Sequence, residues 1–269
     1  MSYRRITALA LAATAALALS ACSPATSEPS SSADADAPDY GLVTDGTLTV
    51  ATEGTYRPFT FHDESGDLVG FDVEIAEAVA EKLDLEIVFE ETQWDAIFAG
   101  LDGGRFDVIA NQVSINPERE EKYLFSEPYT VSPGVIVVAE DDDSISSFAD
   151  LEGKTTAQSL TSNWYELATE SGANVEAVEG WAQAVSLLQQ GRVDATINDQ
   201  LTFLDYVNTT PDAAIEVAAE TDETSLSAFA FTQDKEALVA AIDEALAELR
   251  DEGVLAELGE KYFGADVSE

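Results

Sequence analysis

The chain is poor in the side chains on which many enzymes and metal sites depend. Its 269 residues include one cysteine, one histidine and one methionine. A single cysteine excludes an intrachain disulfide, and any His-based triad would have to be built on His62. The sequence has no phosphate-binding loop, dinucleotide fingerprint, paired zinc motif or calcium-loop spacing. We therefore expect no metal, no cofactor and no catalytic step, and we expect His62 to be an exposed residue of a polar turn.

Positive charge is the second thing that this sequence has little of. Lys and Arg together number 12, against 53 Asp and Glu, which gives a formal net charge of −41. A surface of this charge repels nucleic acid and anionic lipid head groups, so neither is an expected partner. Mutual repulsion also favours a monomer. The acids, for example residues 140–143, are expected on solvated faces and in loops.

Long hydrophobic runs are scarce as well, and the one at the N-terminus is short for a membrane span. Arg4 and Arg5 precede an apolar run from Ile6 to Leu19, whereas a spanning helix needs ~20 apolar residues. This pattern is typical of a secretory signal, here residues 1–21. A segment of Ser, Ala, Pro and Asp follows, and it predicts a flexible tether over residues 22–44.

The end of this signal carries a recognisable motif around the single cysteine. Residues 19–22 read LSAC, and they resemble the lipobox of bacterial lipoproteins, in which the cysteine is acylated. The resemblance implies an extracytoplasmic protein that a lipid on Cys22 anchors to the cell membrane. The alternative is an ordinary secretory signal with an incidental cysteine.

What the sequence does contain is one pattern used twice. Residues 94–111 read WDAIFAGLDGGRFDVIAN, and residues 181–198 read WAQAVSLLQQGRVDATIN. In each copy an apolar helical pattern ends at glycine, and a short apolar strand then delivers polar residues. Ligands bind beyond the carboxyl ends of strands in open α/β sheets, so two such ends facing each other predict a cleft. The alternative is coincidence at two helix–strand corners.

Strands and helices alternate along the rest of the chain, which predicts an α/β fold with mostly parallel sheets. Two apolar strands, 135–139 and 225–231, lie where the chain would leave and rejoin a first lobe. They predict a two-strand hinge with a ligand cleft between the lobes. Lobe one is expected to comprise residues 45–132 and 229–269, and lobe two residues 133–228.

Six motifs in a fixed order give the chain a family resemblance over nearly all of residues 46–269. They are EGTYRPF, GFDVEIA, QWDAIFAGLDGGRFDVIANQVSINPER, YLFSEPYT, GRVDATINDQ and KYFGADV. In this order they resemble the polar amino-acid receptors of ABC importers, the family 3 extracellular solute-binding proteins. The resemblance implies a two-lobed periplasmic-binding-protein-like fold of type II, an amino-acid ligand and an ABC permease as partner. Segments 111–115, 158–163 and 261–267 look most like cystine-binding members, which favours L-cystine over glutamine, histidine or arginine.

The charged groups of an amino-acid ligand define the first half of the expected site. A zwitterion removed from water needs a partner for each charge. Arg119 can bind the carboxylate with two hydrogen bonds, and Asp199 can accept the ammonium. Thr161 and Ser162 lie at a predicted helix N-terminus, where backbone N–H groups attract anions, and Asn163 follows them. The resemblance implies the same roles; without it, Arg119 would be interpreted as a surface residue and Asp199 as a helix cap.

The resemblance also implies an aromatic and polar pocket for the ligand's side chain. The matching positions are Glu53, Tyr56, Phe59, Trp94, Asn111, Gln112 and Ser114. Sulfur packs well against aromatic rings, which suits a disulfide ligand. Phe59 and Trp94 could instead belong to the core, and Asn111 could fix the end of its strand. Trp181 is expected only to pack, and Arg57 departs from the family pattern.

Two other functional classes remain open. Some relatives on this fold are dehydratases that act on small carboxylic acids, and Glu53 would be the acid or base of such an enzyme. A receptor's sensor domain is the second alternative, and the absence of a kinase region or a second apolar span speaks against it. Turnover would identify the first class, and a signalling partner would identify the second.

Overall fold

The computed structural model of the protein describes residues 39–268. The expected signal, Cys22 and the tether up to residue 38 therefore lie outside the described residues. Within residues 39–268, none of the helices combines the length and the apolar character that a membrane span requires.

The first part of the described chain alternates strands and helices as its apolar periodicity predicts. The main elements are β1 (Thr47–Thr52), α1 (Phe71–Lys82), β5 (Glu86–Glu91), α2 (Trp94–Asp102) and β6 (Val108–Ser114). Smaller elements lie between and after them: β2 (Thr55–Tyr56), β3 (Thr60–His62), β4 (Leu68–Val69), α3 (Pro117–Glu120) and β7 (Tyr123–Phe125). Pro117 occupies the first turn of α3, where its missing N–H costs nothing.

The second part repeats this alternation before the chain returns. Its elements are β8 (Thr130–Ala139), the 3₁₀ helix η1 (Phe148–Leu151), β9 (Thr155–Gln158), α4 (Asn163–Glu170), β10 (Asn174–Ala177), α5 (Trp181–Gln189), β11 (Thr196–Asp199) and α6 (Gln200–Thr209). The long strand β12 (Ile215–Thr232) then leads into α7 (Glu236–Asp251) and α8 (Val254–Phe263). The Ser162 hydroxyl caps α4 by accepting a hydrogen bond from the Tyr165 N–H, as its position in the sequence predicts.

Strand pairing is mixed, and this differs from the expectation of mostly parallel sheets. One sheet has the order β11-β8-β12-β6-β1-β5, with β7 paired to β12. Within it β1 is parallel to β5 and β6, and in a separate pair β9 is parallel to β10. The crossing strands β8 and β12 instead pair antiparallel along most of β8. Because the chain passes through the hinge in opposite directions, its two passages form an antiparallel ladder that joins the lobes into one sheet.

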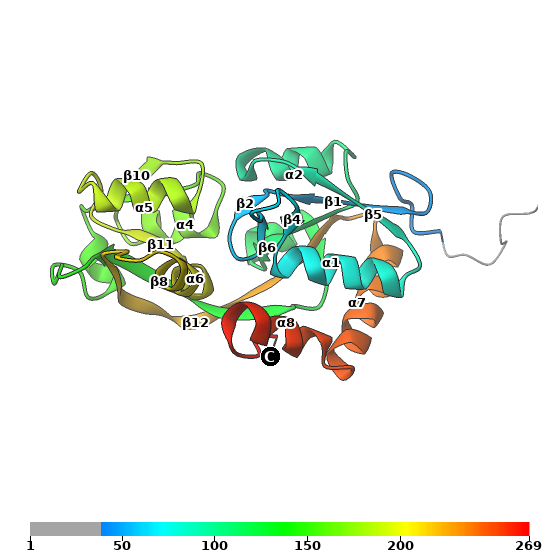
Figure 1. Cartoon of the computed structure of the whole chain (residues 1–269). Helices are drawn as coiled ribbons and strands as arrows, with labels where there is room; N and C mark the ends of the chain where they lie inside the picture. Colours follow the sequence, from blue (N-terminus) through cyan, green and yellow to red (C-terminus); the bar gives the residue numbers. More distant parts are fainter. Residues whose placement is uncertain (1–38, 269) are drawn as a thin grey trace, which may run out of the picture. The chain divides into compact units, whose positions relative to one another are not determined.

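The buried apolar residues divide in the same way as the chain. Two clusters draw on residues 48–129 and 229–267, with Leu201 as the one addition from elsewhere. Two further clusters draw on residues 135–215. Figure 1 shows the elements of residues 39–268 gathered in two groups, with β8 and β12 running between them. The two-lobed α/β class is confirmed, and the boundaries at 132/133 and 228/229 stay a prediction.

Both copies of the repeated pattern fold into a helix followed by a strand, α2–β6 and α5–β11. Gly104 and Gly191 follow the two helices with nearly equal positive φ values, 65° and 66°, a conformation that favours glycine. Asp107 accepts a hydrogen bond from the Thr49 N–H of β1 at 3.0 Å, and Asp194 accepts one from the Thr155 N–H of β9 at 2.7 Å. The two copies therefore share a structure as well as a sequence pattern.

Candidate functional site

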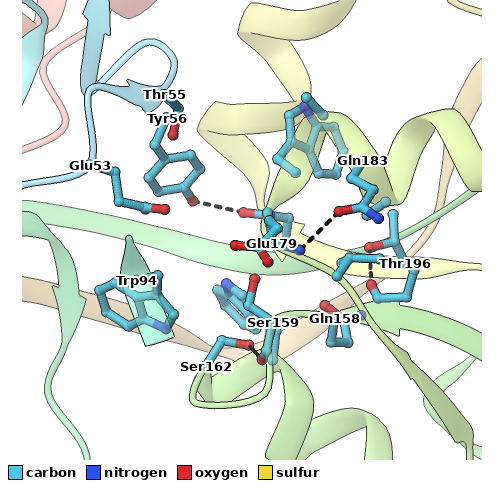
Figure 2. Close-up of a pocket in the computed structure, with 18 of the residues that line it drawn as sticks. Glu53, Thr55, Tyr56, Trp94, Gln158, Ser159, Ser162, Glu179, Gln183 and Thr196 are labelled. Carbon is cyan, nitrogen blue, oxygen red and sulfur yellow. Dashed lines mark hydrogen bonds between the residues drawn. The ribbon is translucent and has the colours of Figure 1, made fainter. Parts of the chain in front are cut away.

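A cavity of about 350 Å³ opens between the two groups of elements. This volume lies within the roughly 300–1,000 Å³ that small-ligand sites occupy. Part of its wall consists of Glu53, Thr55, Tyr56, Gln93, Trp94, Asn111 and Gln112. The opposite part comes from residues 157–159, 162–164 and 178–184 together with Thr196 and Asn198, and it includes Trp164, Glu179 and Trp181. Figure 2 shows Glu53, Tyr56 and Trp94 facing Gln158, Gln183 and Thr196 across this space.

The chain's two repeated strands explain why the cavity lies there. Asn111 and Gln112 lie in the C-terminal half of β6, and Asn198 lies near the end of β11. The N-termini of α4 and α5 complete the wall through Ser162 and Trp181. Strand ends and helix N-termini thus meet at one place, which is where open α/β sheets bind ligands.

The structure brings together seven of the twelve predicted ligand-binding residues on this wall. They are Glu53, Tyr56, Trp94, Asn111, Gln112, Ser162 and Asn163. The other five do not line the cavity: Phe59, Ser114, Arg119, Thr161 and Asp199. Phe59 is fully buried in the core against Tyr56 and Phe263, as the alternative interpretation of Phe59 as a core residue predicts.

Arg119 lies behind the cavity wall with its guanidinium buried. Nη1 donates to the Ser114 carbonyl oxygen at 2.9 Å, and Nη2 donates to the Thr161 carbonyl oxygen at 3.2 Å. Its Cζ lies 5.4 Å from the ring centroid of Trp94, which does line the cavity. Burial lowers the pKa of Arg119 to about 10. Arg119 is the one buried Lys or Arg in the described part of the chain, and it forms none of the ion pairs found there.

Asp199 lies directly after the second strand end, and it caps α6. Its Oδ1 accepts hydrogen bonds from the Ser132 hydroxyl at 2.7 Å and from the Leu201 N–H at 2.8 Å. Burial raises the pKa of Asp199 to about 6. Among residues 39–268 no cation pairs with this carboxylate, so its negative charge would gain from a cationic ligand.

Asp72 is a part of the site that the sequence analysis missed. Its carboxylate accepts hydrogen bonds from the N–H and Nε2 of Gln112, at 2.6 and 2.7 Å, and from the Tyr129 hydroxyl at 3.0 Å. Burial raises the pKa of Asp72 to about 7. These bonds hold Gln112, at a φ of 50°, in place on the cavity wall. The sequence feature that could have revealed Asp72 is its position as an acid on the apolar face of α1, in the first turn of the helix.

Glu53 and Asn111 form a second polar pair on the wall. The Asn111 side chain donates to Glu53 Oε2 and accepts from the Glu53 N–H, both at 2.8 Å. Burial raises the pKa of Glu53 to about 7, with smaller contributions from Asp95 and Glu179. Asn111 lies in the middle of β6, so it does not fix the end of its own strand, contrary to the alternative interpretation. It instead ties β6 to Glu53 directly after β1, and it orients the carboxylate of Glu53.

Several polar contacts cross the predicted lobe boundary beside the cavity. The Tyr56 hydroxyl donates to Asn198 Oδ1 at 2.8 Å and accepts from the Thr202 hydroxyl at 3.0 Å. At the rim, Arg57 Nε lies 3.6 Å from Asp205 Oδ2. This ion pair gives Arg57, which departs from the family pattern, a place at the interface between the lobes.

Thr161 makes a further contact of this kind. Its hydroxyl donates to Asp95 Oδ1 at 2.9 Å, and its carbonyl oxygen is the one that receives the Arg119 guanidinium. Together with the Tyr56 and Arg57 contacts, these bonds hold the two walls of the cavity against each other.

Trp181, the counterpart of Trp94 in the repeat, has a second role besides packing. Trp181 lines the cavity as well as packing edge-on against Tyr206, so the expectation of packing alone was incomplete. The repeat could have predicted this position, because Trp181 is the counterpart of Trp94.

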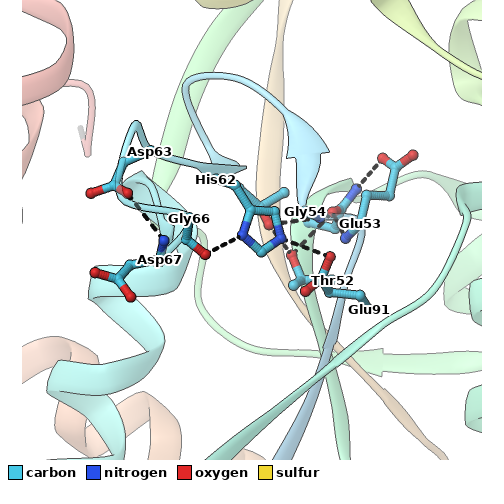
Figure 3. Close-up of polar contacts among 10 residues, drawn as sticks. Thr52, Glu53, Gly54, His62, Asp63, Gly66, Asp67 and Glu91 are labelled. Atoms are coloured by element: carbon cyan, nitrogen blue, oxygen red, sulfur yellow. Dashed lines mark hydrogen bonds and ion pairs between the residues drawn. The ribbon is translucent and has the colours of Figure 1, made fainter.

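His62 is exposed, as predicted, and its two ring nitrogens contact Gly66 and Glu91 (Figure 3). The hydrogen bond with Glu91 raises the pKa of His62.

Comparison with known proteins identifies the family. The chain matches the model of bacterial extracellular solute-binding proteins, family 3, over residues 48–265. It belongs to this family. The chain is 50% identical to the L-cystine-binding protein TcyA of Bacillus subtilis over 224 residues, which is 83% of either chain. It is also 50% identical to a probable amino-acid ABC transporter-binding protein of Haemophilus influenzae, over 83% of this chain and 87% of that one.

Solved structures of relatives bear on the arrangement of the lobes. The L-cystine solute receptor of Neisseria gonorrhoeae, unliganded and open, is 47% identical over 84% of this chain and 97% of its own, with a TM-score of 0.58. An ancestral arginine-binding protein bound to glutamine is 35% identical over 82% and 99%, yet its TM-score is 0.78. A hinge rotation lowers overall similarity without changing either lobe. The present structure is thus more similar overall to the ligand-bound relative than to the open, unliganded receptor.

Proposed function

We propose that this solute-binding protein captures L-cystine between its lobes and delivers it to the permease of an ABC importer. The names of the relatives support this ligand and this partner, since a cystine-binding protein and a cystine receptor are 50% and 47% identical to the chain. Glutamine, histidine and arginine remain the alternative ligands. Selectivity would come from matched charges in a cavity that closes around the ligand, without a catalytic step.

The observation that carries the proposal is a set of charged groups at or beside the cavity that form no ion pair among residues 39–268. Arg119 is a buried cation beside the cavity, and Glu53, Asp72 and Asp199 are carboxylates whose pKa values burial raises. Isolated charges are costly to bury unless something pairs with them. The carboxylate of an amino acid would pair with Arg119, and its ammonium would pair with Asp199.

The remaining wall suits a disulfide. Tyr56, Trp94, Trp164 and Trp181 contribute aromatic rings to the cavity. Sulfur makes favourable contacts with aromatic rings, typically at ~5 Å. The central part of L-cystine, which is apolar and carries both sulfurs, would lie among these rings.

Isothermal titration of the purified protein with L-cystine, followed by glutamine, histidine and arginine, tests the proposal. We expect one-to-one binding of L-cystine and weaker binding of the others. Replacing Arg119 by Ala should weaken binding by at least about 30-fold, because losing one partner of a buried charge pair costs roughly 2–5 kcal/mol. The exposed Arg105→Ala is the matched control. Retained affinity in Arg119→Ala would contradict the carboxylate clamp.

The place of the protein in the cell follows from the N-terminal residues together with the family. Members are extracellular solute-binding proteins, and the LSAC sequence supports a lipid on Cys22 as the anchor. Residues 22–44 would then tether a monomeric binding domain to the membrane. Membrane fractionation of the parent and of Cys22→Ala tests the anchor. Release of the variant into the soluble fraction is expected, and equal distribution of both proteins would contradict it.

A dehydratase-like activity is the second candidate, and the raised pKa of Glu53 is the observation in its favour. The same burial raises the pKa of Asp72 and Asp199, so the shift is a property of the whole site and does not single out one catalytic acid. An assay of turnover with small carboxylic acids separates the two functions. We expect none, and saturable turnover that Glu53→Gln abolishes would favour the enzyme.

A further inference from the structure

We propose that the lobe-two wall of the cavity holds the second amino-acid head group of a two-headed ligand. Glu179 would accept its ammonium, and the N-terminus of α5 would hold its carboxylate. This inference rests on the proposed function and deepens it. L-cystine has two identical zwitterionic ends, and the clamp of Arg119 and Asp199 serves one of them.

Glu179 is a carboxylate on this wall with no assigned role. It lines the cavity and is exposed, and it takes part in none of the ion pairs found among residues 39–268. Its backbone N–H donates to Gln183 Oε1 at 3.1 Å, which fixes the turn into α5. In Figure 2 Glu179 lies in the middle of the view, between Tyr56 and Gln158. Its side chain is therefore placed to meet a cation inside the cavity.

The N-terminus of α5 opens onto the same space. All residues from 179 to 184 line the cavity, and α5 runs over the nine residues Trp181–Gln189. Gly180 precedes the helix, no side chain caps it, and its first turn contains no acid. The first N–H groups of a helix lack partners within the helix and attract anions. A ligand carboxylate would satisfy them.

Gln158 adds a second, independent polar group to this wall. Its side chain is 4% exposed and lines the cavity. Its Nε2 has no hydrogen-bond partner among the described residues. An unsatisfied buried donor is costly, typically by about 1–3 kcal/mol. A carboxylate at the start of α5 is the type of acceptor that this amide lacks.

The charge of the cavity wall points to a second ammonium as well. The lining residues include two carboxylates, Glu53 and Glu179, and no Lys or Arg. Each wall contributes one of them, so closure of the lobes brings like charges together. A ligand whose single ammonium pairs with Asp199 leaves Glu179 without a cationic partner, whereas a ligand with a second ammonium supplies one. The cavity therefore favours two-headed amino acids over single amino acids of similar size.

Two cysteine derivatives separate the two halves of this site. S-(2-aminoethyl)-L-cysteine carries a second ammonium without a second carboxylate, and S-carboxymethyl-L-cysteine carries the reverse. We expect Glu179→Gln to weaken the binding of L-cystine and of the aminoethyl derivative by about tenfold each, because each loses a charge-assisted hydrogen bond. Binding of the carboxymethyl derivative should change less than about twofold. Glu216→Gln, an exposed acid of β12 away from the cavity, is the matched control.

The outcomes of these titrations are distinct. Equal weakening of all three ligands by Glu179→Gln, or no weakening of any, would overturn the inference while leaving L-cystine as the ligand. If the parent protein does not bind L-cystine at all, both the proposed function and this inference are wrong. Selective loss of the two ligands that carry a second ammonium would support both.

Discussion

The two copies of the repeated segment have the same local structure and different surroundings. Both place an asparagine on the strand, Asn111 in the middle of β6 and Asn198 next to the last residue of β11. Asn111 bonds to Glu53 within its own lobe, whereas Asn198 accepts a hydrogen bond from Tyr56 across the lobe boundary. The first copy therefore stabilises one wall of the cavity, and the second copy helps to hold the two walls together.

The next residue differs between the copies, and so does its chemistry. Gln112 follows Asn111 and is neutral, with its side chain held by Asp72. Asp199 follows Asn198 and brings a buried carboxylate to the corresponding strand end. The same pattern thus carries an amide side chain after the asparagine in lobe one and a buried carboxylate in lobe two. The duplicated segments supply the strands beside the site, and the residues that differ between the two copies supply its charge.

The largest expected difference between the copies concerns their aspartates. Asp107 is fully buried and pairs with Lys235 at 3.0 Å, whereas Asp194 is half-buried and forms no ion pair found in residues 39–268. Breaking a buried pair costs about 3–5 kcal/mol, so Asp107→Asn should lower the free energy of unfolding by that amount. Asp194→Asn should lower it by about 1 kcal/mol, as for one hydrogen bond. Urea denaturation of both variants measures this, and equal losses would contradict the difference in surroundings.

The second prediction separates the charge of Asp199 from its role as a helix cap. Asparagine caps helices about as well as aspartate, so Asp199→Asn should leave the free energy of unfolding nearly unchanged. Its affinity for L-cystine should fall by about 10- to 100-fold, because the ligand ammonium loses a buried carboxylate. Titration calorimetry and thermal unfolding of the same sample report the two effects. Unchanged affinity would show that Asp199 acts only as a cap.

The third prediction concerns how stability and ligand affinity depend on pH through the buried carboxylates. Burial raises the pKa of Asp199 to about 6 and that of Asp72 to about 7. An acid with a raised pKa holds its proton more tightly in the folded chain than in the unfolded chain. The free energy of unfolding of the empty protein should therefore fall as the pH rises from about 4 to about 7. A ligand ammonium favours the carboxylate, so affinity should instead rise over the upper part of this range, by up to about tenfold per pH unit.

Thermal unfolding and calorimetry across this range test the opposite signs of the two slopes. Asp199→Asn should flatten part of the affinity profile, because it removes one titrating group. An affinity that falls as pH rises from about 5 to 7 would be incompatible with ammonium recognition by these carboxylates.

The smallest expected effect comes from the contact that distinguishes Asn198 from Asn111. Asn198→Ala should weaken ligand binding by about three- to tenfold, because closure loses a hydrogen bond worth about 1 kcal/mol. Asn111→Ala should instead lower the free energy of unfolding, since Asn111 is buried and bonds within its own lobe. If both variants affected only stability, the second copy would have no special part in closure.

Sequence reasoning recovered the local features of the fold, because these depend on neighbouring residues. The helix starting at Trp94 and the cap at Ser162 follow from apolar periodicity and capping chemistry. The pairing of β8 with β12 did not follow in this way. It joins residues up to 97 positions apart, such as Thr130 and Ser227, and nothing within either strand specifies its partner.

The candidate site was recovered only in part, for the same reason. Seven predicted residues line the cavity because the repeat and the family motifs mark strand ends and helix starts. Trp181 and Glu179 were passed over, although the repeat pointed to Trp181. Asp72 could not be placed from its spacing, since it reaches Gln112 forty positions away through the packing of α1 on the sheet.

The sequence by itself determined the class of the protein, the duplicated helix–strand unit and the excess of negative charge. These are properties of composition, periodicity and motif order, which the chain carries before it folds. Only the tertiary structure decided which strand ends share a cavity and which charges lie buried without partners. The contact between Tyr56 and Asn198, 142 positions apart, exists because β8 and β12 set one lobe against the other. Such distances depend on the packing of whole lobes, which no local pattern specifies.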